Sequence, residues 1–287
     1  MNHATTIGPQ KLLVVGGPAS GKTTYRTQLY QRVEHGDGDL QLVSSVSDMA
    51  ALDGDVERLV HGLQPMHTNH DIYHSTEFTV EKRDKTRFSL EFADYGGEQI
   101  RQIGETNFIP FEWVKRARQS TCWLLFLRID IVRPLKSFMV EPVHIALHPK
   151  ADEDLPTAER STELMAIDTL QRLIFVRGAS LRYPLQQPRL AVLLSCWDEL
   201  PEAERSFTPW SVLEKRAPLF SQFVAANWKI NECKVWGLSS TERKLSEEVP
   251  DLEFARRGPE CVGYVVLGDG STSSDLTQPV SWLMETV

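Results

Sequence analysis

The feature that most constrains this chain is the run GGPASGKT at residues 16–23, which matches the pattern GxxxxGK[ST] in full. An apolar run at residues 11–15, KLLVV, precedes it and suits a buried strand, and helix-compatible sequence follows from about residue 22 to residue 33. This strand–loop–helix context is what the pattern requires, because loop N–H groups and a helix N-terminus together attract phosphate. Lys22 is expected to reach the β- and γ-phosphates of a nucleotide, and the Thr23 hydroxyl to bind Mg²⁺. The residues expected to contact the nucleotide in this loop are Gly16, Gly17, Pro18, Ala19, Ser20, Gly21, Lys22, Thr23 and Thr24.

Further apolar runs predict more buried strands. Residues 121–129 (TCWLLFLRI) and 190–195 (LAVLLS) are similar to the first run, and residues 234–238 (KVWGL) form a shorter one. Residues 76–81 and 87–92 instead alternate apolar and polar side chains, which predicts two half-buried strands joined as a hairpin. We therefore expect a mixed sheet with parallel central strands and one antiparallel member.

Helical periodicity fills the gaps between these strands. One helical segment begins with Thr208 as an N-cap and Pro209 in its first turn, and Pro279 opens a short helix that runs through Met284. The apolar residues at helical spacing are Leu164, Ile167, Leu170 and Ile174, and then Leu213, Ala217, Phe220 and Val224. Strands that alternate with helices predict a three-layer α/β fold. We expect a single domain over residues 1–287, with insertions near residues 35–67, 131–157 and 243–275.

Composition and charge exclude several classes of protein. With 41% hydrophobic and 24% charged residues, the chain has the makeup of a globular protein rather than a fibre or a disordered chain. Its formal charge of −8 offers no bulk attraction to nucleic acid or to anionic membranes. The longest apolar stretch, residues 122–132, is interrupted by Arg128 and Asp130 and is too short to span a bilayer. Four scattered cysteines without a CxxC pair, and an N-terminus without a signal-peptide pattern, predict a reduced cytoplasmic protein.

A second motif, DYGGE at residues 94–98, follows the strand expected at residues 87–92. A carboxylate at the end of a strand, here Asp94, can hold a metal-bound water, and a glycine three residues later, here Gly97, can give its N–H to a γ-phosphate. The pattern DxxG is weak by itself, since acid-plus-glycine turns follow many strands. Its position after the first strand–loop–helix unit makes it a stronger signal.

Two more motifs complete a recognisable series: SCWD at residues 195–198 and GLSS at residues 237–240, each at the end of an expected strand. With them the chain resembles the Ras-like GTPases of the TRAFAC class, whose motifs run P-loop, switch threonine, DxxG, NKxD and SA[KL]. More narrowly, GGPASGKTT, DYGGE, LLSCWDEL, VWGLSS and DLTQPVSWL resemble the bacterial double-GTPase families predicted from conflict-system neighbourhoods. The resemblance implies a P-loop NTPase fold with a mixed, mostly parallel six-stranded sheet, its second strand antiparallel, and helices on both faces.

The resemblance also implies how a guanine base is read. Asp198 would accept the N1 and N2 hydrogens of guanine, a bidentate contact that adenine cannot make. Ser239 and Ser240 stand at the family's Ser-Ala, and the Ser240 N–H would meet guanine O6. The sequence departs from the family pattern at Ser195, where Asn is usual, and at Cys196, where Lys is usual. These departures remove an amide contact and an aliphatic stem over the base.

The catalytic residues implied by the resemblance are Thr68, Glu98 and Gln99. Thr68 is favoured over Thr76 as the switch threonine, because Thr76 is expected to begin a strand. Thr23, Thr68 and Asp94 form the expected Mg²⁺ set. Glu98 stands where a water-orienting Gln is usual, and a carboxylate near a γ-phosphate is electrostatically unfavourable.

Three functions remain open from these residues. The first is a Mg²⁺-dependent GTPase that hydrolyses GTP slowly, acts as a molecular switch and is completed by a protein partner or a second GTPase. The second is a nucleotide-gated interaction module with negligible hydrolysis, an alternative that Glu98 keeps open. The third is a P-loop kinase or ATPase, in which Asp198 and Ser239 would lack a role.

Overall fold

The structure of the protein is a computed structural model, which describes residues 10–36, 38–44, 50–66, 74–94, 106, 108–132 and 162–285. The predictions made for Thr68, Gly97, Glu98 and Gln99 lie outside the described residues. For Asp94 the structure describes the backbone as the last residue of a strand.

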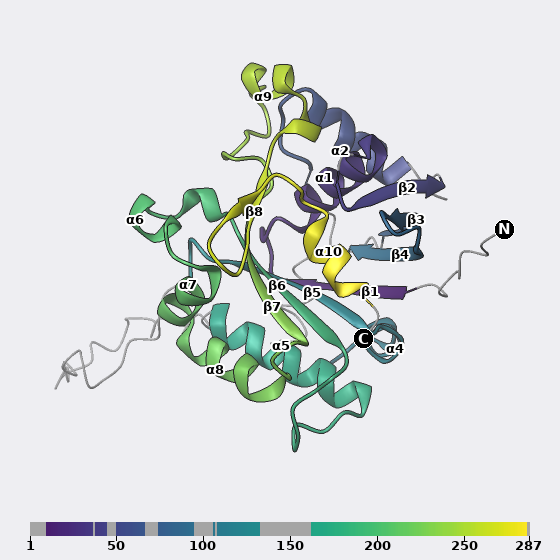
Figure 1. Ribbon diagram of the computed structural model, residues 1–287, viewed down its shortest axis with the longest axis vertical. Coiled ribbons are helices and arrows are strands. Elements are labelled where there is room, and N and C mark those ends of the chain that lie inside the picture. The colour runs from purple at the N-terminus through teal and green to yellow at the C-terminus, as the bar shows by residue number, and fades with distance from the viewer. Residues whose placement is uncertain are drawn as a thin grey trace, which may run out of the picture.

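The described strands form one mixed sheet with the order β2-β3-β4-β1-β5-β6-β7-β8-β9 (Figure 1). The strands are β1 (Gln10–Gly16), β2 (Leu40–Ser44), β3 (His74–Lys82), β4 (Arg87–Asp94), β5 (Cys122–Arg128), β6 (Arg189–Ser195), β7 (Cys233–Ser239), β8 (Tyr264–Val266) and β9 (Thr272–Ser273). Central strands β4, β1, β5, β6 and β7 pair in parallel, and β3 pairs antiparallel with β4.

The expected six-stranded core is confirmed within this sheet as β3-β4-β1-β5-β6-β7. Of these six strands, the antiparallel β3 is the second in chain order, and its hairpin with β4 has the predicted turn between Lys82 and Arg87. The sheet continues past the core at both edges. Strand β2 joins β3, and the β8–β9 pair joins β7, all in antiparallel pairing.

Helices cover both faces of the sheet, which gives the expected three layers (Figure 1). The helices are α1 (Lys22–His35), α2 (Ala50–Val60), α4 (Phe111–Gln119), α5 (Thr162–Arg177), α6 (Glu202–Arg205), α7 (Pro209–Arg216), α8 (Pro218–Asn227), α9 (Leu252–Arg257) and α10 (Gln278–Leu283), with single 3₁₀ turns η1 (Trp197–Glu199) and η2 (Pro259–Cys261).

The alternation of side chains along the central strands divides the core into two apolar layers. In β1, Leu13 and Val15 face the layer built with α4, α5, α7 and α8, whereas Leu12 and Val14 face the layer built with α1 and α10. Strands β5 and β6 are buried on both faces, as their near-continuous apolar sequence predicts.

The predicted helical segment that begins at Thr208 is two helices rather than one continuous helix. The Thr208 hydroxyl caps α7 by accepting the Ser211 N–H at 3.3 Å. Pro218 then interrupts the run, because a proline ring disfavours the helical conformation of the residue before it. Ala217 accordingly has φ −134° and ψ 65°, and α8 begins at Pro218.

Regular structure also lies where the sequence pattern is least clear. Residues 35–67 contain β2 and α2, and residues 243–275 contain α9, η2, β8 and β9. The two segments touch, since the Asp251 N–H before α9 donates to the Gly62 carbonyl after α2 at 2.9 Å. Apart from the eleven-residue α2, these elements are too short to produce a readable period.

A tight contact fixes the positions of β7 and the turn η1. Trp197 is 1% exposed, and a Cβ atom on Gly237 would lie 2.6 Å from its indole ring and 3.0 Å from the Val266 Cβ. Trp197 therefore packs in the core, and Gly237 lacks a side chain so that the ring can lie over the strand.

We predict that Gly237→Ala lowers the free energy of unfolding by about 1–3 kcal/mol, because the added methyl must displace a buried ring. Urea denaturation measures the change. A matched control is Gly54→Ala in α2, where a Cβ would meet nothing within 4 Å. That substitution should be neutral or stabilising by up to about 1 kcal/mol. Equal stability of Gly237→Ala and the wild type would contradict the packing argument.

Candidate functional site

The candidate site lies at the carboxyl edge of the parallel strands, where ligands of open α/β sheets bind. Strand β1 ends at Gly16, β5 at Arg128, β6 at Ser195 and β7 at Ser239, so all four end at the same edge. The predicted phosphate and base motifs follow directly from β1, β6 and β7.

The P-loop, residues 16–23, turns tightly between β1 and α1. A Cβ on Gly16 would lie 2.8 Å from Ser20 Oγ and 2.9 Å from the Phe126 Cβ, so only glycine fits at the end of the strand. Gly21 has φ +82°, a left-handed conformation that favours glycine, and α1 begins at the next residue. By contrast, a Cβ on Gly17 would meet nothing within 4 Å, which leaves this side of the loop open.

The Lys22 ammonium lies inside the P-loop. It donates to the carbonyls of Gly16 at 2.9 Å and Gly17 at 2.8 Å, and to Ser20 Oγ at 3.3 Å. The residue is only 7% exposed. Its charge is therefore concentrated at the concave side of the loop, where it can meet an anionic ligand.

Thr23 and Thr24 follow Lys22 in the first turn of α1 and are half-buried. Asp94, the last residue of β4, lies at the same edge, since β4 pairs in parallel with β1 up to the Leu13–Ala93 pair. Mg²⁺ in nucleotide sites uses one or two protein oxygens together with phosphates and waters. Thr23 brings a hydroxyl to this edge from α1, and the backbone of Asp94 ends the neighbouring strand there.

The turn after β6 contains three of the predicted residues. Ser195 is buried, its Oγ has no hydrogen-bond partner, and its Cβ lies 3.9 Å from the Cβ position of Gly21. Cys196 has φ +57°, and burial raises the pKa of its thiol to about 12, so the side chain is neutral. The lysine that this position usually holds thus has no charged substitute here.

Asp198 lies in η1, is partly exposed, and is close enough to Tyr264 of β8 to interact with it electrostatically. Its charge helps to raise the pKa of the Tyr264 hydroxyl, although burial of Tyr264 is the larger cause. Because Tyr264 pairs with Ser239 across β8 and β7, Asp198 and the end of β7 belong to one region of the surface.

The β7 loop, residues 239–242, contains the remaining predicted residues. Ser239 is fully buried and its Oγ accepts the Glu242 N–H at 2.9 Å. Gln28 of α1 donates from Nε2 to the Ser240 carbonyl at 2.8 Å. Residues that follow β1, β6 and β7 thus converge at one edge of the sheet.

Some residues at this edge were not singled out by sequence reasoning. Arg128 at the end of β5 donates to Asp130 at 3.0 Å and lies 3.4 Å from a Glu199 carboxylate oxygen. Gln28, Glu242 and Arg128 have no motif around them. Their contacts join residues that are 21 apart for Glu242 and Gly263, 71 apart for Arg128 and Glu199, and 212 apart for Gln28 and Ser240. No local pattern in the sequence identifies them.

Thr76, the rival candidate for the switch threonine, lies inside β3 and is 2% exposed. It is paired with Phe92 of β4 and so belongs to the sheet rather than to a loop. Within the part of the chain that the structure describes, no helix has the length and apolar character needed to cross a membrane.

Comparison with known proteins agrees with the motif series. A family model described as Double-GTPase 1 matches residues 13–283, which includes every motif from the P-loop to α10. No curated protein matches the sequence significantly. Since the family match extends over nearly the whole chain, the protein belongs to the Double-GTPase 1 family and is a GTP-binding GTPase.

Proposed function

We propose that the protein binds GTP with Mg²⁺, hydrolyses it slowly, and acts in the cytoplasm as a molecular switch that a protein partner or second GTPase completes. One observation carries the proposal: the P-loop, Asp198 and the β7 loop lie at one edge of the sheet, and the hydrogen bond from Gln28 to Ser240 joins α1, which follows the P-loop, to the β7 loop. A nucleotide that spans these segments would have its phosphates at the P-loop and its base between Asp198 and Ser240.

The P-loop would bind the phosphates of the nucleotide. A β- or γ-phosphate can exchange places with the carbonyls that now accept from Lys22, because a charge-assisted bond to phosphate is stronger than one to a neutral carbonyl. Thr23, with Thr68 and Asp94, would hold Mg²⁺, which neutralises phosphate charge when bound.

We predict that Lys22→Ala abolishes tight GTP binding while the chain remains folded. The substitution removes a buried cation that donates to loop oxygens, so the P-loop loses its charge and the apolar core is unchanged. Calorimetric titration with GTP measures the loss. Lys11→Ala, which removes an exposed amine bonded to Gln119, is the control and should bind normally. Wild-type affinity in folded Lys22→Ala would remove the P-loop assignment.

Base recognition rests on Asp198 and the β7 loop. We predict that GTP binds at least tenfold more tightly than ATP, since a bidentate polar contact contributes on the order of 1.4 kcal/mol or more. Asp198→Asn should collapse this preference, because one acceptor becomes a donor. Competition between GTP and ATP for binding to the wild type and to Asp198→Asn measures this preference.

Glu199→Gln provides the control for that measurement, since Glu199 is the adjacent carboxylate and its partner is Arg128. This variant should keep the preference for GTP. Equal affinity of the wild type for ATP and GTP would contradict guanine recognition and favour the kinase or ATPase alternative.

Hydrolysis is proposed to be slow because Glu98 replaces the usual water-orienting amide, with Gln99 beside it. A partner that supplies an arginine can accelerate such reactions by about 10³–10⁵. We predict single-turnover hydrolysis well below ~1 s⁻¹ for the purified protein. Glu98→Gln should leave the rate unchanged or raise it, because it removes a negative charge near the γ-phosphate.

Phosphate release from a fixed amount of bound GTP measures both rates. Fast turnover by the wild type and inactive Glu98→Gln would make Glu98 a general base and overturn the proposal of a partner-completed switch. Turnover too slow to measure would instead favour the interaction module, in which GTP binding alone determines the state.

A further inference from the structure

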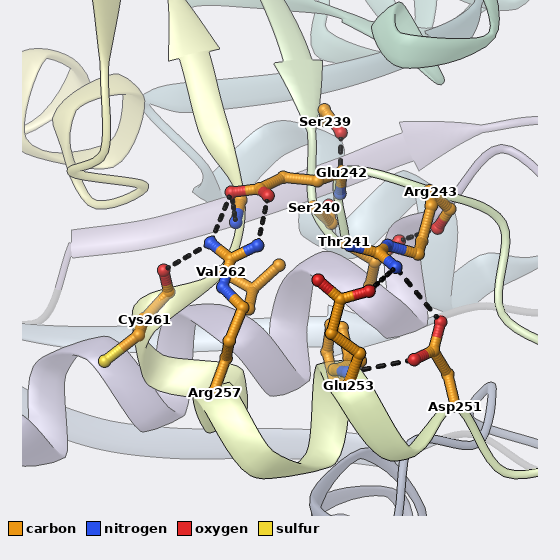
Figure 2. A network of polar contacts seen from close by, with 12 residues as sticks. Ser239, Ser240, Thr241, Glu242, Arg243, Asp251, Glu253, Arg257, Cys261 and Val262 are labelled. Carbon is orange, nitrogen blue, oxygen red and sulfur yellow. Dashed lines mark hydrogen bonds and ion pairs between the residues drawn. The ribbon is translucent and has the colours of Figure 1, made fainter.

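The β7 loop is embedded in a polar network that the proposed base contacts do not themselves require. Figure 2 shows this network, in which Glu242, the last residue of the loop, pairs with Arg257, and Arg243 pairs with Asp251 and Glu253. The network joins the end of β7 to helix α9 and to the turn η2, which lie later in the chain. Its geometry bears on how the Ser240 N–H is presented to a ligand.

Three backbone contacts enclose the loop. Gln28 of α1 holds the Ser240 carbonyl at 2.8 Å, and Ser239 Oγ accepts the Glu242 N–H at 2.9 Å. Gly263 packs on the loop so closely that a Cβ there would lie 2.6 Å from the Ser240 carbonyl oxygen. The loop is thus enclosed between α1 and the segment that enters β8.

Glu242 closes this arrangement from the other end of the loop. Its carboxylate receives two N–H groups of Arg257, at 2.7 and 3.2 Å, and the Gly263 N–H at 3.1 Å (Figure 2). Glu242 itself has φ +60°, a left-handed conformation that costs free energy for a residue other than glycine. The carboxylate contacts hold the backbone in this conformation.

The ion pair between Glu242 and Arg257 is suited to positioning the β7 loop. Hydrogen bonds from Arg257 are the main cause that lowers the pKa of Glu242, so the carboxylate stays ionised near neutral pH. The side chains of Glu242 and Arg257 are 28% and 37% exposed. Ion pairs that are this exposed contribute little to overall stability. The bidentate geometry of this ion pair instead fixes the orientation of the two side chains relative to each other.

We propose that Glu242, clamped by Arg257, is a positioning residue for base recognition. It fixes the β7 loop so that the Ser240 N–H points at the base, and it does not touch the nucleotide. This inference rests on the proposed guanine site, because it assigns a role to the residues that hold one wall of that site. Without the clamp, the strained residue 242 relaxes and the Ser239–Ser240 backbone moves with it.

The test compares Glu242→Gln and Arg257→Gln with the wild type. Three dissociation constants are measured for each full-length protein: those for GDP, ADP and inorganic pyrophosphate. Both variants should bind GDP about tenfold more weakly, the loss expected when one hydrogen bond is misdirected. Pyrophosphate, which contacts only the P-loop, should bind as before, and the ratio of ADP to GDP constants should fall about tenfold.

Arg243→Gln is the matched control. It breaks a second arginine–carboxylate contact to α9, at 2.9 Å to Glu253 and 3.5 Å to Asp251, and leaves the Glu242 clamp intact. Its ratio of ADP to GDP dissociation constants should equal that of the wild type. Circular dichroism confirms that each variant is folded, and Arg257→Gln tests the clamp from α9 should Glu242→Gln fail to fold.

The outcomes separate the two proposals. Unchanged GDP affinity in both clamp variants overturns the positioning role, as does a parallel loss of GDP and pyrophosphate binding, which indicates a general structural effect. The same fall in ratio for Arg243→Gln also overturns it. A wild-type ratio near one contradicts the guanine site itself, and this result is read before any variant is compared.

Discussion

Helix α1 is buried on nearly every side, and the site depends on the polar contacts that it makes there. Tyr25 donates to the Leu276 carbonyl at 2.8 Å, and burial raises the pKa of its hydroxyl, which stays protonated. Gln28 holds Ser240 and Arg32 holds the Val262 carbonyl at 2.8 Å. Arg26 forms a buried ion pair with Asp55 of α2 at 2.7 Å. A buried polar group is costly when unpaired, so each contact fixes the partner segment relative to the helix.

This arrangement joins the two halves of the candidate site mechanically. The P-loop leads directly into the N-terminus of α1, and the side chain of Gln28, about two turns later in the helix, donates a hydrogen bond to the β7 loop. A shift of α1 along its axis would therefore move both segments together. Ser195 lies next to Gly21, so the P-loop and the turn that contains Asp198 are neighbours. The distance between the P-loop and the proposed base-binding residues is thus defined by packed core elements rather than by loops alone.

The sequence predicted the core of the fold because local patterns dominate there. The P-loop, the β3–β4 hairpin and the buried strands each have a period or a motif that fits within about ten residues. The features that could not be predicted have local causes in some places and depend on contacts far apart in the chain in others. Pro218 divides a run with helical spacing into two helices, and β8 and β9 have three and two residues, too few for a period. Gln28 and Glu242 look like ordinary surface residues in sequence, since only the folded chain brings them to the β7 loop.

The departures at Ser195 and Cys196 change how base recognition is distributed over the site. Ser195 carries a hydroxyl in place of the usual amide, and Cys196 is neutral because burial raises the pKa of its thiol, so the charge of the usual lysine is missing. In the proposed function, discrimination then depends on Asp198 and on the β7 loop. A site with fewer contacts depends more on the direction of those that remain, because a misdirected hydrogen bond loses most of its strength. The clamp of Glu242 and Arg257, the glycine at position 263 and the Gln28 contact all restrict one short backbone segment. In the proposed site, a few hydrogen-bonding groups held rigidly in place would recognise the base where other sites use a larger number of contacts.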